Sequence, residues 1–210
     1  PVLLLDEPLS NLDAKLREEM QFELRQIQRK VGTTTVMVTH DQGEALSISD
    51  RVVVMQAGRI TQADTPLRVY EHPGNQFIST FVGKANLLEG RVVSGGAQRT
   101  GVAVGPLHLA LGPGDAGLRP GSRVVVGIRP EKLACVALGA GNCDGEVRER
   151  FFLGSQWMYR LETSLGQLLV LAANDGTPAL EPGARTGLAW HESSVRLVSA
   201  EQHETQGLAA

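Results

Sequence analysis

The sequence of 210 residues lacks the features that mark several common classes of protein. Its two cysteines, Cys135 and Cys143, are too few for a disulfide framework or a four-ligand zinc site, which favours a reducing, cytosolic setting. No apolar run approaches the roughly 18 to 20 residues that cross a bilayer, so we expect the chain to serve a membrane only through a partner. Lysine and arginine number 20 against 23 aspartates and glutamates, and the net charge of −3 excludes the basic footprint of a nucleic-acid-binding protein.

The composition is otherwise that of a globular protein, with 42% hydrophobic and 20% charged residues. Strand and helix patterns alternate up to about residue 82, and short β-like runs separated by turns rich in glycine and proline follow. The sequence therefore predicts an α/β part over residues 1–82, an all-β barrel or sandwich over residues 83–200, and a flexible polar tail over residues 201–210.

Two apolar runs in the first part are typical of strands that are buried on both faces in a parallel sheet. Residues 2–5 are wholly apolar, and residues 34–39 are apolar and β-branched. Between these runs, apolar side chains recur every three or four residues over residues 16–31, which predicts an amphipathic helix. Gly32 follows as a natural end of that helix.

The strongest local signal is the sequence Leu-Leu-Leu-Asp-Glu-Pro at residues 3–8. An apolar strand here delivers two adjacent carboxylates, Asp6 and Glu7, at its carboxyl end, where open α/β sheets place their ligands. In nucleoside-triphosphate hydrolysis one such carboxylate supports Mg²⁺, and a second one orients or deprotonates the attacking water. Alternatively, Asp6 and Glu7 are solvated residues of a turn after the strand.

A histidine follows the next predicted strand. His40 ends the sequence Val-Thr-His at residues 38–40, and two parallel neighbouring strands would bring it to the same edge of the sheet as Glu7. A histidine there can hydrogen-bond a terminal phosphate oxygen and a water. Taken alone, His40 would more often be a structural or surface histidine.

Taken together, residues 1–75 resemble the carboxyl-terminal half of the nucleotide-binding domain of ABC transporters, a P-loop NTPase. The match runs through the Walker B strand at residues 2–6, the glutamate that follows it, the D-loop at residues 10–13 and the histidine after the next strand. The resemblance implies ATP and Mg²⁺ as cofactors.

The resemblance also implies a role for each matched side chain. Asp6 would support Mg²⁺, Glu7 would polarise the hydrolytic water, and His40 would sense the γ-phosphate. Ser10 and Asp13 would belong to the nucleotide-binding D-loop, with Asp13 reaching across a dimer interface to the partner's nucleotide.

The phosphate cradle and the signature sequence of this family are missing. A P-loop needs G-x-x-x-x-G-K-[ST], and the only Gly-Lys pair, at residues 83–84, is followed by alanine and lacks the earlier glycine. The chain also begins at Pro1 with a strand already under way. We therefore expect a carboxyl-terminal fragment that is inactive alone, whereas its full-length parent would hydrolyse ATP.

The second part of the chain resembles the TOBE (transport-associated OB) domain of importer ATPases. The resemblance rests on Phe-Val-Gly-Lys-Ala-Asn at residues 81–86, Gly-Ile-Arg-Pro-Glu at residues 127–131 and Arg-Phe-Phe-Leu-Gly-Ser at residues 150–155. It implies an OB-like regulatory β-domain after the ATPase part. ATPases of polyamine, ferric-iron, sulfate and sugar importers share this order, and the Phe-Leu-Gly segment favours polyamine or ferric iron.

The family further implies partners and a location. We expect a peripheral subunit on the cytoplasmic face of the inner or cell membrane, bound to transmembrane permease subunits and paired with a second copy of itself. The apolar runs at residues 167–173 and 187–190 are candidates for that homodimer contact.

Two other functions compete with an importer ATPase. The β-domain could be a regulatory module that binds a small ligand and performs no catalysis. A nucleic-acid-binding OB domain is disfavoured, because such domains use basic grooves with exposed aromatic residues, whereas this part of the chain is neutral and poor in aromatics.

Overall fold

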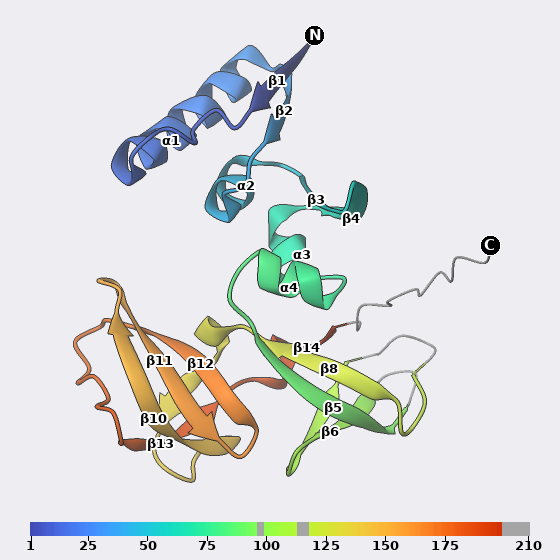
Figure 1. Cartoon of the computed structure of the whole chain (residues 1–210), viewed down its shortest axis with the longest axis vertical. Coiled ribbons are helices and arrows are strands. Elements are labelled where there is room, and N and C mark those ends of the chain that lie inside the picture. The colour runs from blue at the N-terminus through green and yellow to red at the C-terminus, as the bar shows by residue number, and fades with distance from the viewer. Residues whose placement is uncertain (96–98, 113–117, 199–210) are drawn as a thin grey trace, which may run out of the picture. The chain divides into compact units, whose positions relative to one another are not determined.

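The computed structural model (Figure 1) describes three stretches of the chain, residues 1–95, 99–112 and 118–198. The predicted tail at residues 201–210 lies outside them. Contacts divide the chain into two compact units, which are residues 1–74 with 81–83, and residues 75–80 with those from 84 onward. The first unit is α/β and the second is almost entirely β, which confirms the predicted fold class.

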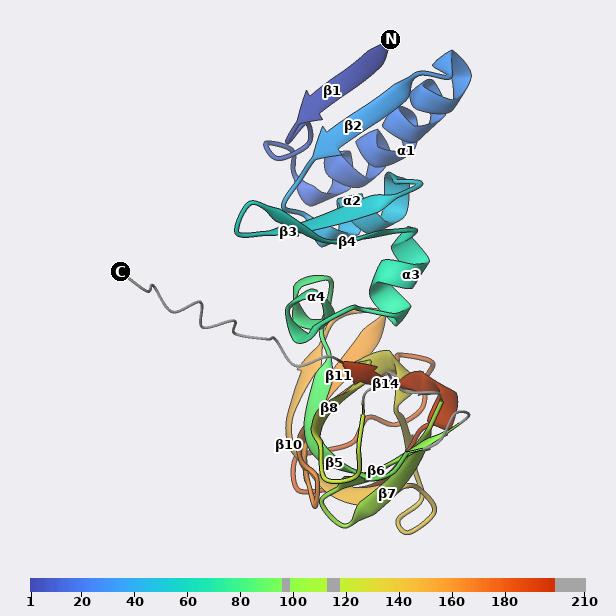
Figure 2. The same cartoon turned by 90° about the vertical axis from the view of Figure 1, so that its right-hand side faces the viewer.

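The first unit alternates strands and helices. Its elements are β1 (Val2–Asp6), α1 (Ala14–Val31), β2 (Thr34–Val38), α2 (Gln42–Ile48), β3 (Val52–Gln56), β4 (Arg59–Asp64) and α3 (Pro66–Glu71). β1 and β2 pair in parallel, and α1 runs beside them (Figure 2). β3 and β4 form an antiparallel hairpin. No helix in the described stretches is long and apolar enough to span a membrane.

The main helix of this unit ends at Gly32, as the sequence predicts, and begins after Asp13. The Asp13 side chain accepts a hydrogen bond from the amide of Leu16, which satisfies one of the donors left free at a helix start. At the other end Gly32 adopts a left-handed conformation, with φ of 66°, and its amide donates to the carbonyl of Gln28.

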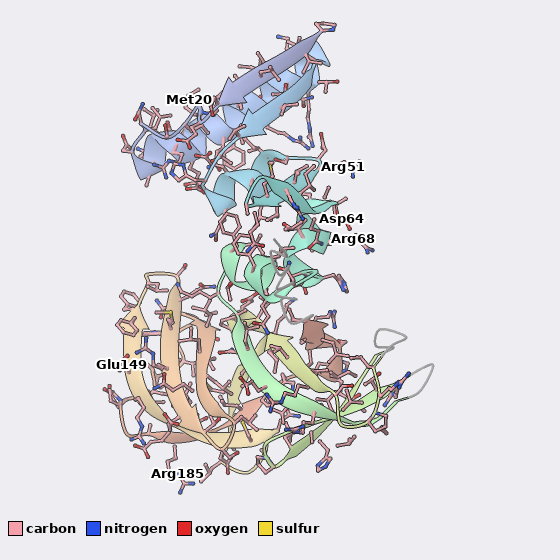
Figure 3. The ribbon with its side chains drawn as sticks, turned by 45° about the vertical axis from the view of Figure 1, so that its right-hand side comes forward. Met20, Arg51, Asp64, Arg68, Glu149 and Arg185 are labelled. Carbon is pink, nitrogen blue, oxygen red and sulfur yellow. The ribbon has the colours of Figure 1, made fainter. Side chains whose placement is uncertain are left out.

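The start of α3 carries a local network around Asp64 (Figure 3). The Thr65 amide donates to one carboxylate oxygen of Asp64 at 2.8 Å, and Arg68 Nε donates to the other at 2.8 Å. These hydrogen bonds, the amide first and the guanidinium second, lower the pKa of the Asp64 carboxyl. The carboxylate is therefore ionised at neutral pH, and a negative charge just before the start of a helix is favourable.

Apolar side chains of the first unit are exposed, although residues 2–5 and 34–39 have the composition of strands that are buried on both faces in a parallel sheet. Leu4 is 72% exposed and Val36 51%, and α1 contains no buried residue. The reason is that β1 and β2 have only each other as sheet neighbours within the described residues. An open apolar groove, lined by side chains of α1, β2 and β3, is the result.

Within the described residues, the second unit contains ten strands and all but the last residue of one helix. They are α4 (Gln76–Phe81), β5 (Asn86–Ser94), β6 (Thr100–Val104), β7 (Leu107–Leu111), β8 (Arg123–Ile128), β9 (Ala134–Val136), β10 (Cys143–Phe152), β11 (Gln156–Thr163), β12 (Gly166–Ala173), β13 (Arg185–Ala189) and β14 (Val195–Val198). They form two five-stranded antiparallel sheets, in the orders β14-β8-β5-β6-β7 and β12-β11-β10-β13-β9. The β-like runs of the sequence became strands, and only the three-residue β9 was not anticipated.

The two sheets share one hydrophobic core. Val102 and Val126 from one sheet and Leu161 and Val170 from the other have no or almost no exposed surface, and they belong to the same cluster. Val102, Leu161 and Val170 each lie between two more exposed residues of their strand, as expected for sheets with one buried face. The core explains why the second part of the sequence is rich in short β-branched runs.

The apolar runs that the sequence offered for a dimer contact lie in β12 and β13 and supply this core. Leu168, Val170 and Leu188 are fully buried, and Trp190 is 8% exposed. These buried side chains do not form an intermolecular surface. The expectation of a dimer contact at residues 167–173 and 187–190 is therefore wrong for them. A run of apolar residues does not reveal which face of a strand meets the core.

The buried Asn86 joins the two sheets. Its side-chain nitrogen donates to the carbonyl of Leu169 at 2.8 Å, and its side-chain oxygen accepts from the amide of the same residue at 2.7 Å. The amide group of Asn86 thus pairs with β12 as a strand backbone would. This pair of hydrogen bonds satisfies polar groups that closure of the core removes from water.

The cysteines are free. Cys135 in β9 and Cys143 in β10 both pair with Leu188 in β13, one on each side of that strand. Two strand spacings, about 10 Å, separate them, which is too far for a disulfide without backbone movement. Burial raises the pKa of both thiols, so they stay protonated near neutral pH.

Candidate functional site

The parallel pairing of β1 and β2 brings the predicted acidic and histidine residues together. Asp6, the last residue of β1, lies opposite Val38, the last residue of β2. The pairing continues one step further, because the amide of Glu7 donates to the carbonyl of Val38 at 2.8 Å. Residues that follow each strand, Glu7 and His40, therefore lie at one edge of the sheet, as the sequence predicts.

Glu7 and His40 are in direct contact. Nδ1 of His40 lies 3.0 Å from Oε1 of Glu7. The side chain of Glu7 is 46% exposed and that of His40 is 72% exposed, so both are accessible to a ligand. The carboxylate thus meets a group that is able to donate a hydrogen bond and carry a positive charge.

The backbone of Glu7 is strained. Its φ of 44° is in the left-handed region, which costs a residue with a Cβ about 1 kcal/mol. Both the hydroxyl and the amide of Ser10 donate to the carbonyl of Glu7, at 3.0 and 3.3 Å, and the Val38 contact holds its amide. Strain that is held in this way at a carboxylate is a common feature of functional sites.

The other predicted site residues have separate positions. Asp6 is exposed beside Glu7 at the end of β1. Asp13 caps α1 through its carboxylate, and the Ser10 hydroxyl is engaged with the Glu7 carbonyl. The structure therefore brings Glu7, His40 and Ser10 together in one contact network, whereas Asp6 and Asp13 flank it.

The acidic residues at the end of β1 are of a type that fits Mg²⁺. No group of three or more His, Cys, Asp or Glu residues within the described stretches could hold a metal by itself. Mg²⁺ prefers oxygen ligands and usually keeps several waters, with one or two carboxylates and substrate phosphates completing its shell. Asp6, with Glu7 beside it, supplies oxygen donors of this kind.

A second polar cluster, next to this site, was not predicted from the sequence. Arg17 of α1 donates to the carbonyl of Leu12 at 2.9 Å and to the carboxylate of Asp41 at 3.3 Å. Glu44, only 2% exposed, lies with one carboxylate oxygen 3.9 Å from Arg17 Nε. The Asp-x-x-Glu spacing of residues 41–44, a helix-start signal, was the one feature of the sequence that could have indicated this cluster.

The arginine of the Arg-Pro-Glu motif has a structural position. Arg129 is 6% exposed and donates to the carbonyls of Ser79 and Lys84, at 2.8 and 3.1 Å. Its guanidinium thus binds backbone carbonyls at the end of β8. A buried guanidinium that donates to two backbone carbonyls has a structural role here.

Comparison with known proteins adds to this geometry. Residues 126–198 match the model of the TOBE domain. The chain is 42% identical over 185 residues to the spermidine/putrescine import ATP-binding protein PotA 1 of Pseudomonas aeruginosa, with 84% of this chain and 48% of the relative covered. It is 37% identical over 203 residues to the Fe(3+) ions import ATP-binding protein FbpC 1 of Rhizobium meliloti, with 94% of this chain and 55% of the relative covered.

The chain is homologous to the ATP-binding subunits of ABC importers. It spans about half the length of the importer subunits that it matches. Among solved structures it is similar to the cytoplasmic molybdate-binding protein ModG, at 20% identity and a TM-score of 0.47, over 54% of this chain and 94% of that one. The recognition of an importer ATP-binding subunit with a TOBE domain, made from the motifs of the sequence, is confirmed.

Proposed function

We propose that this chain supplies the carboxyl-terminal part of the ATP-hydrolysing subunit of an ABC import transporter. In this proposal residues 1–82 belong to the nucleotide-binding domain and residues 83–200 form the regulatory TOBE domain. The observation that carries it is the 3.0 Å contact between Glu7 and His40 at the carboxyl ends of two parallel strands. The relatives named for spermidine/putrescine and Fe(3+) import favour polyamines or ferric iron as the transported solute.

The residues at this edge divide the proposed chemistry among them. Mg²⁺, when bound with ATP, neutralises charge that develops on the phosphates. Asp6 would hold the ion through a coordinated water, and Glu7 would accept a hydrogen bond from the attacking water. When both ring nitrogens of His40 carry a proton, the ring is positively charged and has two donors. Nδ1 would then donate to Glu7, and Nε2 would donate to a terminal phosphate oxygen.

The turn after Glu7 has two roles in this proposal. Ser10 fixes the strained carbonyl of Glu7, which orients the carboxylate. Asp13 begins α1 and, with Ser10, would face the nucleotide bound by a second copy. The phosphate cradle must come from outside residues 1–210, because this sequence contains no G-x-x-x-x-G-K-[ST].

The first test is nucleotide binding and hydrolysis. We expect millimolar ATP with Mg²⁺ to leave the melting temperature of residues 1–210 unchanged, since a ligand that binds the folded state must raise it. A chimaera that joins the amino-terminal part of the P. aeruginosa relative to Pro1 should gain both ATP-dependent stabilisation and ATP hydrolysis. A folded chimaera that binds ATP without hydrolysing it would contradict the proposed function and favour a ligand-binding β-module.

We also propose a homodimer that works with transmembrane permease subunits on the cytoplasmic face of the membrane. The exposed side chains of Phe151, Phe152 and Leu153, at the β10–β11 turn, are the apolar surface that we assign to the second copy. The arginine next to them, Arg150, is paired with Glu181 at 2.7 Å, which balances its charge beside this surface.

The dimer has a direct measurement. Light scattering of the whole chain at tens of micromolar should give twice the monomer mass, and Phe152→Glu should give the monomer mass because it places a charge at the apolar centre of the contact. Phe22→Glu, at an exposed phenylalanine of α1 in the other unit, is the matched control and should leave the mass unchanged. A monomer before substitution would contradict this surface as a dimer contact.

A further inference from the structure

One arginine in α1 binds two separate turns of the candidate site. The guanidinium of Arg17 donates through one terminal nitrogen to the carbonyl of Leu12 at 2.9 Å. Through the other terminal nitrogen it donates to the carboxylate of Asp41 at 3.3 Å. Twenty-four residues separate Arg17 from Asp41 in the sequence, so this contact joins parts of the unit that no local hydrogen bond connects.

A buried carboxylate holds this guanidinium in place. Glu44 is 2% exposed, and its Oε1 lies 3.9 Å from Arg17 Nε, a buried nitrogen without a hydrogen-bond partner. The other oxygen of Glu44 accepts from the hydroxyl of Thr39 at 2.7 Å. Since a buried carboxylate is costly unless it is paired, the charge of Arg17 is needed where it lies.

The same cluster fixes the turn that contains His40. The Thr39 hydroxyl accepts from the amide of Asp41 at 3.0 Å, and Asp41 Oδ1 accepts from the amide of Glu44 at 3.0 Å. The residues on both sides of His40 are therefore tied to Glu44, and through it to Arg17. His40 is the exposed residue of this turn, and its contact with Glu7 depends on the direction in which the turn presents it.

We infer that Arg17 is a positioning residue that couples the Ser10–Asp13 turn to the His40 turn and so sets the contact between His40 and Glu7. The inference rests on the proposed function for the roles of Glu7 and His40, and deepens it by naming the device that holds them. Leu12 immediately precedes Asp13, and Asp41 immediately follows His40. A displacement of either turn is thus transmitted to the other through a single rigid, planar group with several donors.

A general stabilising role for Arg17 makes a different prediction, and the same helix contains a matched control. Arg25, two turns further along α1, forms an ion pair with Asp50 just beyond α2. It therefore also joins α1 to the region of α2, but at neither turn of the site. If an effect of Arg17→Met comes only from the loss of an ion pair between α1 and the region of α2, Arg25→Met should produce the same effect.

The first experiment measures the His40–Glu7 contact without nucleotide. In the 210-residue chain, Glu7→Gln should move the ¹⁵N resonances of the His40 ring, because it removes a charge 3.0 Å from Nδ1. In the Arg17→Met background the same substitution should move them much less, whereas in the Arg25→Met background the response should be retained. An undiminished response in the Arg17→Met background would overturn the inference.

A second variant protects this test from loss of folding. Arg17→Met leaves Glu44 as an unpaired buried charge, so the double variant Arg17→Met with Glu44→Gln removes both charges and keeps an acceptor for Thr39. It should lose the His40 response as well. A folded double variant with the full response, or unfolding of both variants, would assign Arg17 to stability alone and overturn the positioning role.

Activity of the chimaera separates this inference from the proposed function. Arg17→Met should lower kcat about 10- to 100-fold, as small misplacements of reacting groups do, with little change in KM for ATP. Arg17→Lys should restore part of the loss, because it keeps the charge but has no fork to join both turns. A chimaera that hydrolyses ATP and is insensitive to Arg17→Met would overturn the coupling and leave the roles of Glu7 and His40 intact.

Discussion

Replacement of Glu7 by glutamine is expected to lower ATP hydrolysis by the chimaera about 10²- to 10⁴-fold, the usual contribution of a general base. The amide has the same shape as the carboxylate but cannot accept a proton from the attacking water. Asp6, which we assign to Mg²⁺, is unchanged, so nucleotide binding should remain. The measurement is steady-state phosphate release, together with the rise in melting temperature that ATP with Mg²⁺ produces.

Glu19→Gln is the matched control for this substitution. Glu19 is an exposed glutamate of α1, in the same unit but outside the contact network of Glu7, His40 and Ser10. It should leave hydrolysis within the experimental error of the unchanged chimaera. Retained turnover in Glu7→Gln, with ATP binding intact, would remove Glu7 from its role as the base.

Replacement of Asn86 by alanine is expected to lower the stability of the β-unit by about 2 kcal/mol, the cost of leaving buried polar groups of Leu169 without partners. Urea unfolding followed by tryptophan fluorescence isolates this effect, because both tryptophans, Trp157 and Trp190, lie in that unit. The midpoint should fall without a change of slope.

The matched control for Asn86 is Asn174. Its side chain also donates to a backbone carbonyl, that of Gly154 at 3.1 Å, but from an exposed position where water replaces the lost bond. Asn174→Ala should therefore cost less than about 1 kcal/mol. Equal effects of the two substitutions would mean that the Asn86 pair is not a principal connection between the sheets.

Local features of the fold were predictable because neighbouring residues determine them. The left-handed Gly32 ends α1 as expected, since such an end depends on a few consecutive residues. The β-like runs of the second part became strands for the same reason. β9, with three residues, carries too short a pattern to be distinguished from a loop and exists through its pairing with β13.

The candidate site also has features that the sequence predicts and features that only the structure shows. The apolar strand that ends in Asp6 and Glu7, and the histidine after the next strand, are sequence features, and their juxtaposition follows once the strands are parallel neighbours. The strain at Glu7 and the fixation of its carbonyl by Ser10 depend on where the chain turns back after β1. No pattern of residue types predicts a particular φ value.

The sequence by itself determined the resemblance to importer ATP-binding subunits, the order of an α/β part and a β-domain, and which acidic and histidine side chains follow the strands. Only the tertiary structure decided which apolar residues are buried, because that depends on which strand faces meet: Leu168 and Leu188 enter the core, whereas Leu4 and Val36 are exposed. It also decided that Arg17 joins two turns, since that contact spans 24 residues and exists only after α1 packs beside α2.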